Sequence, residues 1–205
     1  AKYDRISGFA LDATYTLNKK ITLYSQFAKL IGEIDTNMLA PNIRLKKYTL
    51  GMGFIPIGVK AQLGPVKLRS EFRIASRRFL FNYWDRAYDV NRVIVDAKII
   101  TRESQLYQYG SLSGIYTYAT MDVLNLANLG LGYQNMQGER WDEAKKDYKS
   151  GERNQTLLAT IAINTSLIPK IGKAETFYQQ SNVPNPFEFT PSASTIWGYN
   201  IGIEV

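Results

Sequence analysis

The sequence contains neither cysteine nor histidine. Without cysteine, the chain has no disulfide and no thiolate for metal binding or nucleophilic attack. Without histidine, it lacks the general base of Ser–His and Cys–His catalytic systems and every histidine-containing zinc site. The missing cysteine also fits a protein that crosses an oxidising periplasm without needing disulfides. Because the usual nucleophile systems rely on histidine, we expect no enzymatic activity.

Long apolar runs are also missing. No stretch approaches the ~18 consecutive apolar residues that a membrane-spanning helix needs, and residues 1–5 contain no apolar signal region. The strands of a transmembrane β-barrel are compatible with this sequence, because they alternate between apolar and polar residues and build no long apolar run.

Motifs for cofactors, metals and nucleic acids are absent as well. The sequence has no P-loop, dinucleotide fingerprint or EF-hand spacing. The adjacent carboxylates Asp142 and Glu143 do not suggest an acid–base pair. Basic residues alternate with apolar ones and do not cluster on one recognition element, which argues against a nucleic-acid surface. We therefore expect no cofactor, no metal site and no nucleic-acid partner.

The residues that are present suit one folded domain, and we treat residues 1–205 as a single β-barrel domain or a portion of one. Of the 205 residues, 45% are hydrophobic and 13% aromatic, so the composition is not that of a disordered chain. The net charge of +7 permits anionic partners without selecting one.

The dominant period along the chain is two, which is typical of β-strands. In residues 66–75, for example, Val66, Leu68, Phe72 and Ile74 alternate with charged residues. Similar alternation predicts nine antiparallel strands, at about residues 6–17, 21–32, 48–63, 66–75, 114–123, 129–134, 157–163, 174–182 and 194–205. Pro56 interrupts the third strand, and because proline cannot donate to a ladder, we expect a bulge there.

The connections between these strands are alternately short and long. Short turns are expected at residues 18–20, 64–65, 124–127 and 166–173, and long loops at 33–46, 77–112, 137–155 and 183–193. This rhythm is typical of transmembrane barrels, which have short periplasmic turns and long external loops. We expect 77–112 to be an external or lumen-inserted loop, and 137–155 to be a charged loop with a short helical turn at 142–148.

Two folds place the apolar faces differently. In a soluble sandwich or ligand-binding barrel they point inward, whereas in a transmembrane barrel they face lipid. The dense charge on the opposite face favours the transmembrane barrel. The predicted lumen-lining residues are Lys67, Arg69, Glu71, Arg73, Arg77, Tyr116 and Tyr118. The predicted interfacial aromatic girdle is Phe9, Tyr15, Tyr48, Phe54, Trp197 and Tyr199.

The run Gly198-Tyr199-Asn200-Ile201-Gly202-Ile203 resembles the closing β-signal of bacterial outer-membrane β-barrel proteins. The resemblance implies that Gly198, Ile201 and Ile203 are read by the barrel-assembly machinery, and that the protein lies in outer-membrane lipid. The chain departs from that family's pattern at its end, where Val205 stands in place of the usual aromatic residue.

The resemblance also leads to an expectation about completeness. If the C-terminus is periplasmic, all four long loops fall outside and all four short turns fall inside. The first of nine strands would then begin outside the cell, whereas single-chain bacterial barrels have an even strand count. We therefore expect the chain to be a C-terminal part of a larger barrel.

The sequence leaves several functions open. A porin-like barrel would pass small solutes, with anions favoured by its lumen arginines. A structural or assembly barrel would bind a protein partner through its external loops, and a soluble β-barrel would bind a ligand inside.

Overall fold

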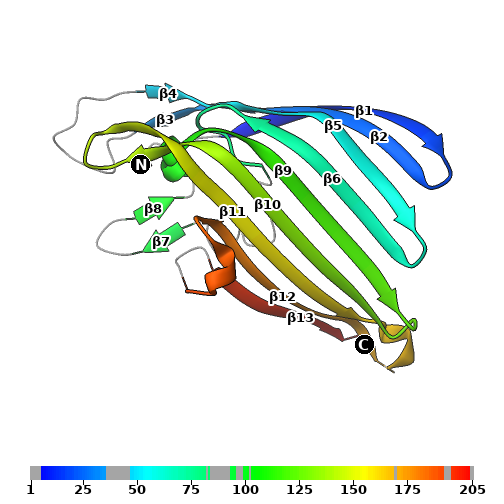
Figure 1. Cartoon of the computed structure of the whole chain (residues 1–205). Helices are drawn as coiled ribbons and strands as arrows, with labels where there is room; N and C mark the ends of the chain where they lie inside the picture. The colour runs from blue at the N-terminus through cyan, green and yellow to red at the C-terminus, as the bar shows by residue number, and fades with distance from the viewer. Residues whose placement is uncertain are drawn as a thin grey trace.

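The computed structural model describes residues 6–35, 47–81, 83, 93–95, 99–101, 103–168, 170–191 and 195–203. These residues form a strongly curved antiparallel sheet of nine strands, in the order β1-β2-β5-β6-β9-β10-β11-β12-β13 (Figure 1). Neighbours in the sheet follow one another along the chain, so the topology is a simple meander. The edge strands β1 and β13 do not pair with each other among the described residues.

The long strands are β1 (Ser7–Asn18), β2 (Ile21–Ile31), β5 (Met52–Leu63), β6 (Val66–Ala75), β9 (Tyr109–Val123), β10 (Ala127–Asp142), β11 (Asp147–Ile163), β12 (Ile171–Val183) and β13 (Thr195–Ile203). Two short hairpins pair β3 (Glu33–Asp35) with β4 (Lys47–Thr49) and β7 (Val93–Val95) with β8 (Ile99–Thr101). The helices among the described residues are short 3₁₀-helices: η2 (Glu103–Gln108), η3 (Thr165–Leu167) and η4 (Pro186–Glu188). No helix in the described part of the chain is long and apolar enough to cross a membrane.

The prediction of an all-β antiparallel fold with nine principal strands is confirmed. The turns form for the reasons expected from their residues. Asn18 accepts hydrogen bonds from the backbone N–H groups of Lys20 and Ile21, which closes the first hairpin. Gly64 has φ of +60° in the turn after β5, a conformation that glycine adopts without a steric penalty.

The bulge expected at Pro56 is also confirmed. The register between β5 and β6 shifts between Phe54 and Ile57, and the register between β2 and β5 shifts opposite it. Pro56 and Ile57 are both exposed there, whereas Ile55 and Gly58 on either side of them are buried, so the alternation of β5 resumes after the bulge in the opposite parity.

The prediction of a charged loop at residues 137–155 is wrong. β10 and β11 stay paired as far as Asp142 and Asp147, and only residues 143–146 form the turn. The expected helical turn is therefore absent from this hairpin extension (residues 137–155). Hydrophobic alternation does not reveal these strand ends because both faces are polar there. Their pairing continues the register that the rest of β10 and β11 sets.

The two faces of the sheet differ in chemistry and in exposure. The apolar face carries large hydrophobic side chains that are exposed, including Leu11, Phe72, Ile115, Leu131, Ile161 and Ile201. The polar face carries charged and amide side chains, several of them buried, including Glu71, Arg73 and Gln134. On the two faces of this sheet, the large apolar side chains are therefore mostly exposed, whereas several charged and amide side chains are buried.

The buried hydrophobic core lies at the end of the sheet where the long connections begin. It contains Leu30, Leu50, Ala75, Phe79, Tyr83, Leu106, Leu112 and Met136. Phe79 and Tyr83 belong to a covering segment (residues 79–81 and 83) that packs on the polar face. A side chain at Gly53 would collide with the Phe79 ring, because a Cβ there would lie 2.2 Å from its nearest ring carbon.

Candidate functional site

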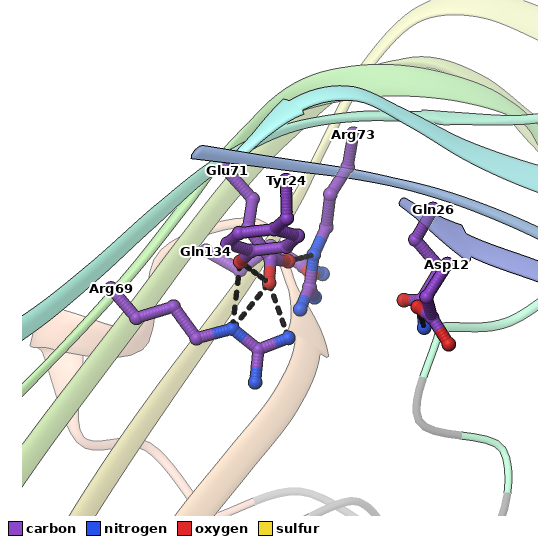
Figure 2. A network of polar contacts seen from close by, with 7 residues as sticks. All are labelled: Asp12, Tyr24, Gln26, Arg69, Glu71, Arg73 and Gln134. Atoms are coloured by element: carbon purple, nitrogen blue, oxygen red, sulfur yellow. Dashed lines mark hydrogen bonds and ion pairs between the residues drawn. The ribbon is translucent and has the colours of Figure 1, made fainter. Parts of the chain in front are cut away.

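A row of side chains crosses six adjacent strands on the polar face. The register pairs Tyr24 with Gly58, Gly58 with Glu71, Glu71 with Tyr116, Tyr116 with Gln134, and Gln134 with Thr156. Since directly opposed residues on one face lie within side-chain reach, this register brings together groups that are far apart in the sequence. Figure 2 shows the resulting polar network.

Gly58 lets Tyr24 reach Glu71 across an intervening strand. The Tyr24 ring lies over Gly58, where a Cβ would come within 2.3 Å of the ring. The Tyr24 hydroxyl then donates a hydrogen bond to the Glu71 carboxylate on β6. A glycine inside a strand often marks such a close approach, and this one admits an aromatic ring.

Glu71 and Arg73 form the buried centre of the network. Arg73 Nε donates to Glu71 Oε2 at 2.6 Å, and Arg73 Nη1 donates to Gln134 Oε1 at 2.7 Å. The Arg73 guanidinium also lies 3.8 Å from the Tyr116 ring centroid and 4.9 Å from that of Phe81. With a side chain only 2% exposed, Arg73 is held by ionic, hydrogen-bonding and cation–π contacts together.

Arg69 forms the accessible edge of the same network. Its Nε donates to the Tyr24 hydroxyl at 2.9 Å, and its guanidinium pairs with Glu71. Its side chain is 41% exposed. Lys60 lies opposite Arg69 in the register, with its Nζ 5.1 Å from the Tyr24 ring centroid. Two arginines therefore contact the Glu71 carboxylate and Lys60 lies beside the Tyr24 ring, which leaves this surface positively charged.

This arrangement can attract and hold an anion. It offers no nucleophile paired with a base, and the described residues contain no cluster of carboxylates, cysteines or histidines that would hold a metal. A positive surface with low-dielectric walls concentrates anions near it. Its accessible cations are Arg69 and Lys60, because the hydrogen bonds and ring contacts of Arg73 occupy that guanidinium within the buried network.

A second ionic contact anchors the hairpin extension. Arg77 Nε and Nη2 donate to the Glu139 carboxylate at 2.7 and 2.6 Å, and the Ser111 backbone N–H donates to the same carboxylate at 3.1 Å. The Arg77 guanidinium also lies 4.3 Å from the Tyr148 ring centroid. The hydrogen bond from Arg77 lowers the pKa of Glu139 from 4.5 to about 2. These contacts tie the start of residues 77–112 to the hairpin.

The structure brings together four of the seven residues predicted to line a lumen: Arg69, Glu71, Arg73 and Tyr116. Tyr118 lies in the next row, where its hydroxyl is 3.3 Å from Thr160 Oγ1. Lys67 is at the opposite end of β6 and pairs with Asp122 at 3.6 Å, while Arg77 pairs with Glu139. That all seven residues line a lumen stays a prediction.

Sequence reasoning missed Tyr24, Gly58 and Gln134 as members of this network. Alternation predicts the polar face for Tyr24 and Gln134, and Gly58 interrupts the pattern of its strand, but none of this indicates which residue each one meets. The available signal was Gly58 itself, a small residue within a strand, which can mark a close approach.

The predicted aromatic girdle lies on the apolar face where it is described. Phe9, Tyr15, Phe54, Trp197 and Tyr199 are all exposed there, whereas the Tyr48 side chain lies outside the described residues. Of the predicted assembly signal, Ile201 and Ile203 are exposed on the apolar face, and Gly198 is on the polar face beneath the Phe177 ring. Val205 lies outside the described residues.

Replacing Glu71 by glutamine should destabilise the protein by about 3 kcal/mol, because Arg73 would stay buried without its counter-charge. Urea unfolding in detergent micelles measures the loss. The double variant Glu71→Gln/Arg73→Met should recover most of it, since the unpaired buried charge is then removed. Lys67→Gln is the control: its ion pair with Asp122 is exposed, so the change should stay within about 0.5 kcal/mol. Equal losses in Glu71→Gln and Lys67→Gln would contradict this account.

The Arg77–Glu139 contact should stabilise the hairpin extension fully above pH 4.5 and lose its contribution as the pH falls toward 2. This sign follows because the folded-state pKa of Glu139 is lowered to about 2 from the ordinary 4.5. In Arg77→Gln, the pKa of Glu139 should rise toward 4.5, as measured by ¹³C NMR of carboxyl-labelled glutamate. Arg140→Gln removes a charge next to Glu139 without removing this hydrogen bond, and should leave the titration near 2. Titration near 4.5 in the unaltered protein would contradict the contact.

Comparison with known proteins does not assign the chain to a family: no protein-family model matches it, and no curated protein is significantly similar to it. The function of the network is therefore inferred from its own charges and geometry.

Proposed function

We propose that this chain forms part of the wall of a porin-like transmembrane β-barrel in the bacterial outer membrane. In this proposal the apolar face contacts lipid and the polar face lines an aqueous channel. Small solutes pass by diffusion, and anions are favoured by the positive charge around Glu71. The remaining strands of the barrel come from outside the described residues.

The observation that carries the proposal is the exposure of the apolar face. Leu131 is 58% exposed, Ile161 47% and Ile201 61%, while Arg73 and Glu71 on the other face are each 2% exposed. A contiguous apolar surface of this extent is rare on a soluble monomer. Hydrocarbon removes the cost of leaving it in water, since burial of apolar area is favourable by about 25 cal/mol per Å².

Strand length and aromatic placement support the same proposal. A tilted strand needs about 9–11 residues to cross the hydrocarbon core, and β1, β2, β5, β6, β12 and β13 have 9–13 residues. β10 and β11 are longer, and their hairpin extension would project beyond the membrane on the side of the long connections. The exposed rings of Trp197 and Tyr199 suit an interface where the ring meets both lipid and water.

A barrel of this kind has several partners. Outer-membrane lipid contacts the apolar face, and the barrel-assembly machinery recognises the last strand through Gly198, Ile201 and Ile203. Small solutes pass along the polar face. A protein partner would bind the hairpin extension or the other external connections.

Leu131→Arg should reduce stability in lipid vesicles by about 2–4 kcal/mol, because Leu131 lies near the middle of the proposed span on the lipid-facing side. Leu158→Arg is the matched control on the polar face, next to Gly132 in the register, and its cost should be smaller because the arginine would meet water. Unfolding from phosphatidylcholine vesicles measures both. A soluble β-protein would instead tolerate Leu131→Arg in detergent-free buffer, which would contradict the proposal.

The protein in planar bilayers should conduct ions and prefer chloride over potassium. The double variant Lys60→Gln/Arg69→Gln should lower this preference at least twofold, since it removes accessible cations from the polar face and keeps Arg73. Reversal potentials in a potassium chloride gradient measure the ratio. Lys146→Gln, at the tip of the hairpin extension, should leave it unchanged. Absence of any conductance would contradict the channel.

A further inference from the structure

A cavity of about 300 Å³ lies between the polar face and the covering segment. On the sheet side it borders β1, β2, β5 and β6, and on the other side it meets residues 79–81 and 83. Gly8, Ala10 and Ala28 line it, and because their side chains are small, they leave room between the sheet and the covering segment. This volume is at the lower end of the range of small-molecule sites, about 300–1,000 Å³.

The walls of this cavity present two kinds of chemistry. Ile55, Phe79, Leu80 and Phe81 supply an apolar wall, and Ile55 and Phe79 in it are almost fully buried. Arg69, Arg73 and Lys29 supply the charged groups of the lining. A cavity with a predominantly apolar lining and a few placed polar groups is the usual form of a ligand site.

Of the two arginines, Arg69 is the one that a ligand can reach. Its described contacts use Nε and Nη2, which leaves the two N–H groups of Nη1 available. Figure 2 shows its guanidinium at the outer end of the network, farther from the strands than the Glu71 carboxylate. Arg73 is occupied by Glu71, Gln134 and the two aromatic rings.

The charge at the cavity calls for a single anionic group. Arg69, Arg73 and Lys29 line the cavity and carry three positive charges, and Glu71 supplies one negative charge between the two arginines. Asp12 on β1, which accepts a hydrogen bond from Gln26 at 2.6 Å, supplies a second negative charge, so one positive charge is left over. A planar carboxylate matches the guanidinium fork, and it is stronger as a charge-assisted acceptor than a neutral hydroxyl.

We propose that this cavity binds an organic carboxylate with an apolar body. The carboxylate pairs with Arg69, and the apolar body packs against Leu80 and Phe81, which line the cavity and are only partly buried. The inference deepens the proposed function, on which it rests for the access of solutes to the polar face. It makes the covering segment one wall of a solute site as well as part of the core.

Isothermal titration of the purified protein in lipid nanodiscs tests the inference with three probes: 3-phenylpropionate, acetate and 3-phenyl-1-propanol. 3-Phenylpropionate should bind at least tenfold more tightly than acetate, which lacks the apolar body, and 3-phenyl-1-propanol, which lacks the charge. Arg69→Gln should weaken 3-phenylpropionate at least tenfold and leave the alcohol unchanged. Ala10→Leu should also weaken 3-phenylpropionate, because it fills the cavity from an exposed edge strand, while Lys146→Gln should not.

The outcomes separate this inference from the proposed function. Equal affinity for the three probes, or binding that does not depend on Arg69, would overturn the carboxylate site even if the protein conducts chloride. Selective binding of 3-phenylpropionate by a protein that conducts no ions would support the site and overturn the channel.

Discussion

The register of the antiparallel sheet is the constraint on which the polar network depends. Each strand on its own places Tyr24, Glu71 or Gln134 on a face, but only the pairing of β2, β5, β6, β9 and β10 aligns them in one row. A slip of one residue in any of these ladders would send a whole strand's side chains to the opposite face. The turns and the bulge at Pro56 hold this register, so they also hold the charge network.

On the polar face, aromatic rings repeatedly lie over glycines of a neighbouring strand. Tyr24 lies over Gly58, Tyr118 over Gly130 and Gly132, and Phe177 over Gly198. In each case the ring of one strand covers the backbone of its neighbour, so a long side chain lies flat instead of standing upright. Tyr24 reaches Glu71 in this way, and Tyr118 approaches Thr160. Because these rings lie flat against the sheet, they leave space above the polar face.

The covering segment uses part of that space, and this links the core to the proposed solute site. Phe79 enters the core over Gly53, while Phe81 stacks on Arg73. The hydrophobic core and the charge network therefore share a border along the covering segment. Burial of Arg73 is tolerated because Glu71 neutralises it and Gln134 satisfies another donor, whereas a charge without such partners would be costly. Arg69 stays at the accessible edge, where it can serve a ligand.

The sequence by itself determined the strands, the turns and the face to which most residues belong. Alternation is a local property, so residues 66–75 show their apolar and charged faces without reference to any other strand. Only the tertiary structure decided which polar residues meet, because the partners are distant: Tyr24 and Glu71 are 47 residues apart, and Arg73 and Gln134 are 61 apart. It also decided that residues 137–155 continue the hairpin. The polar ends of β10 and β11 pair there in the register that the rest of these two strands sets. The pattern of side chains along a strand reports that strand's own environment, whereas the contacts between strands depend on which strand pairs with it and in which register.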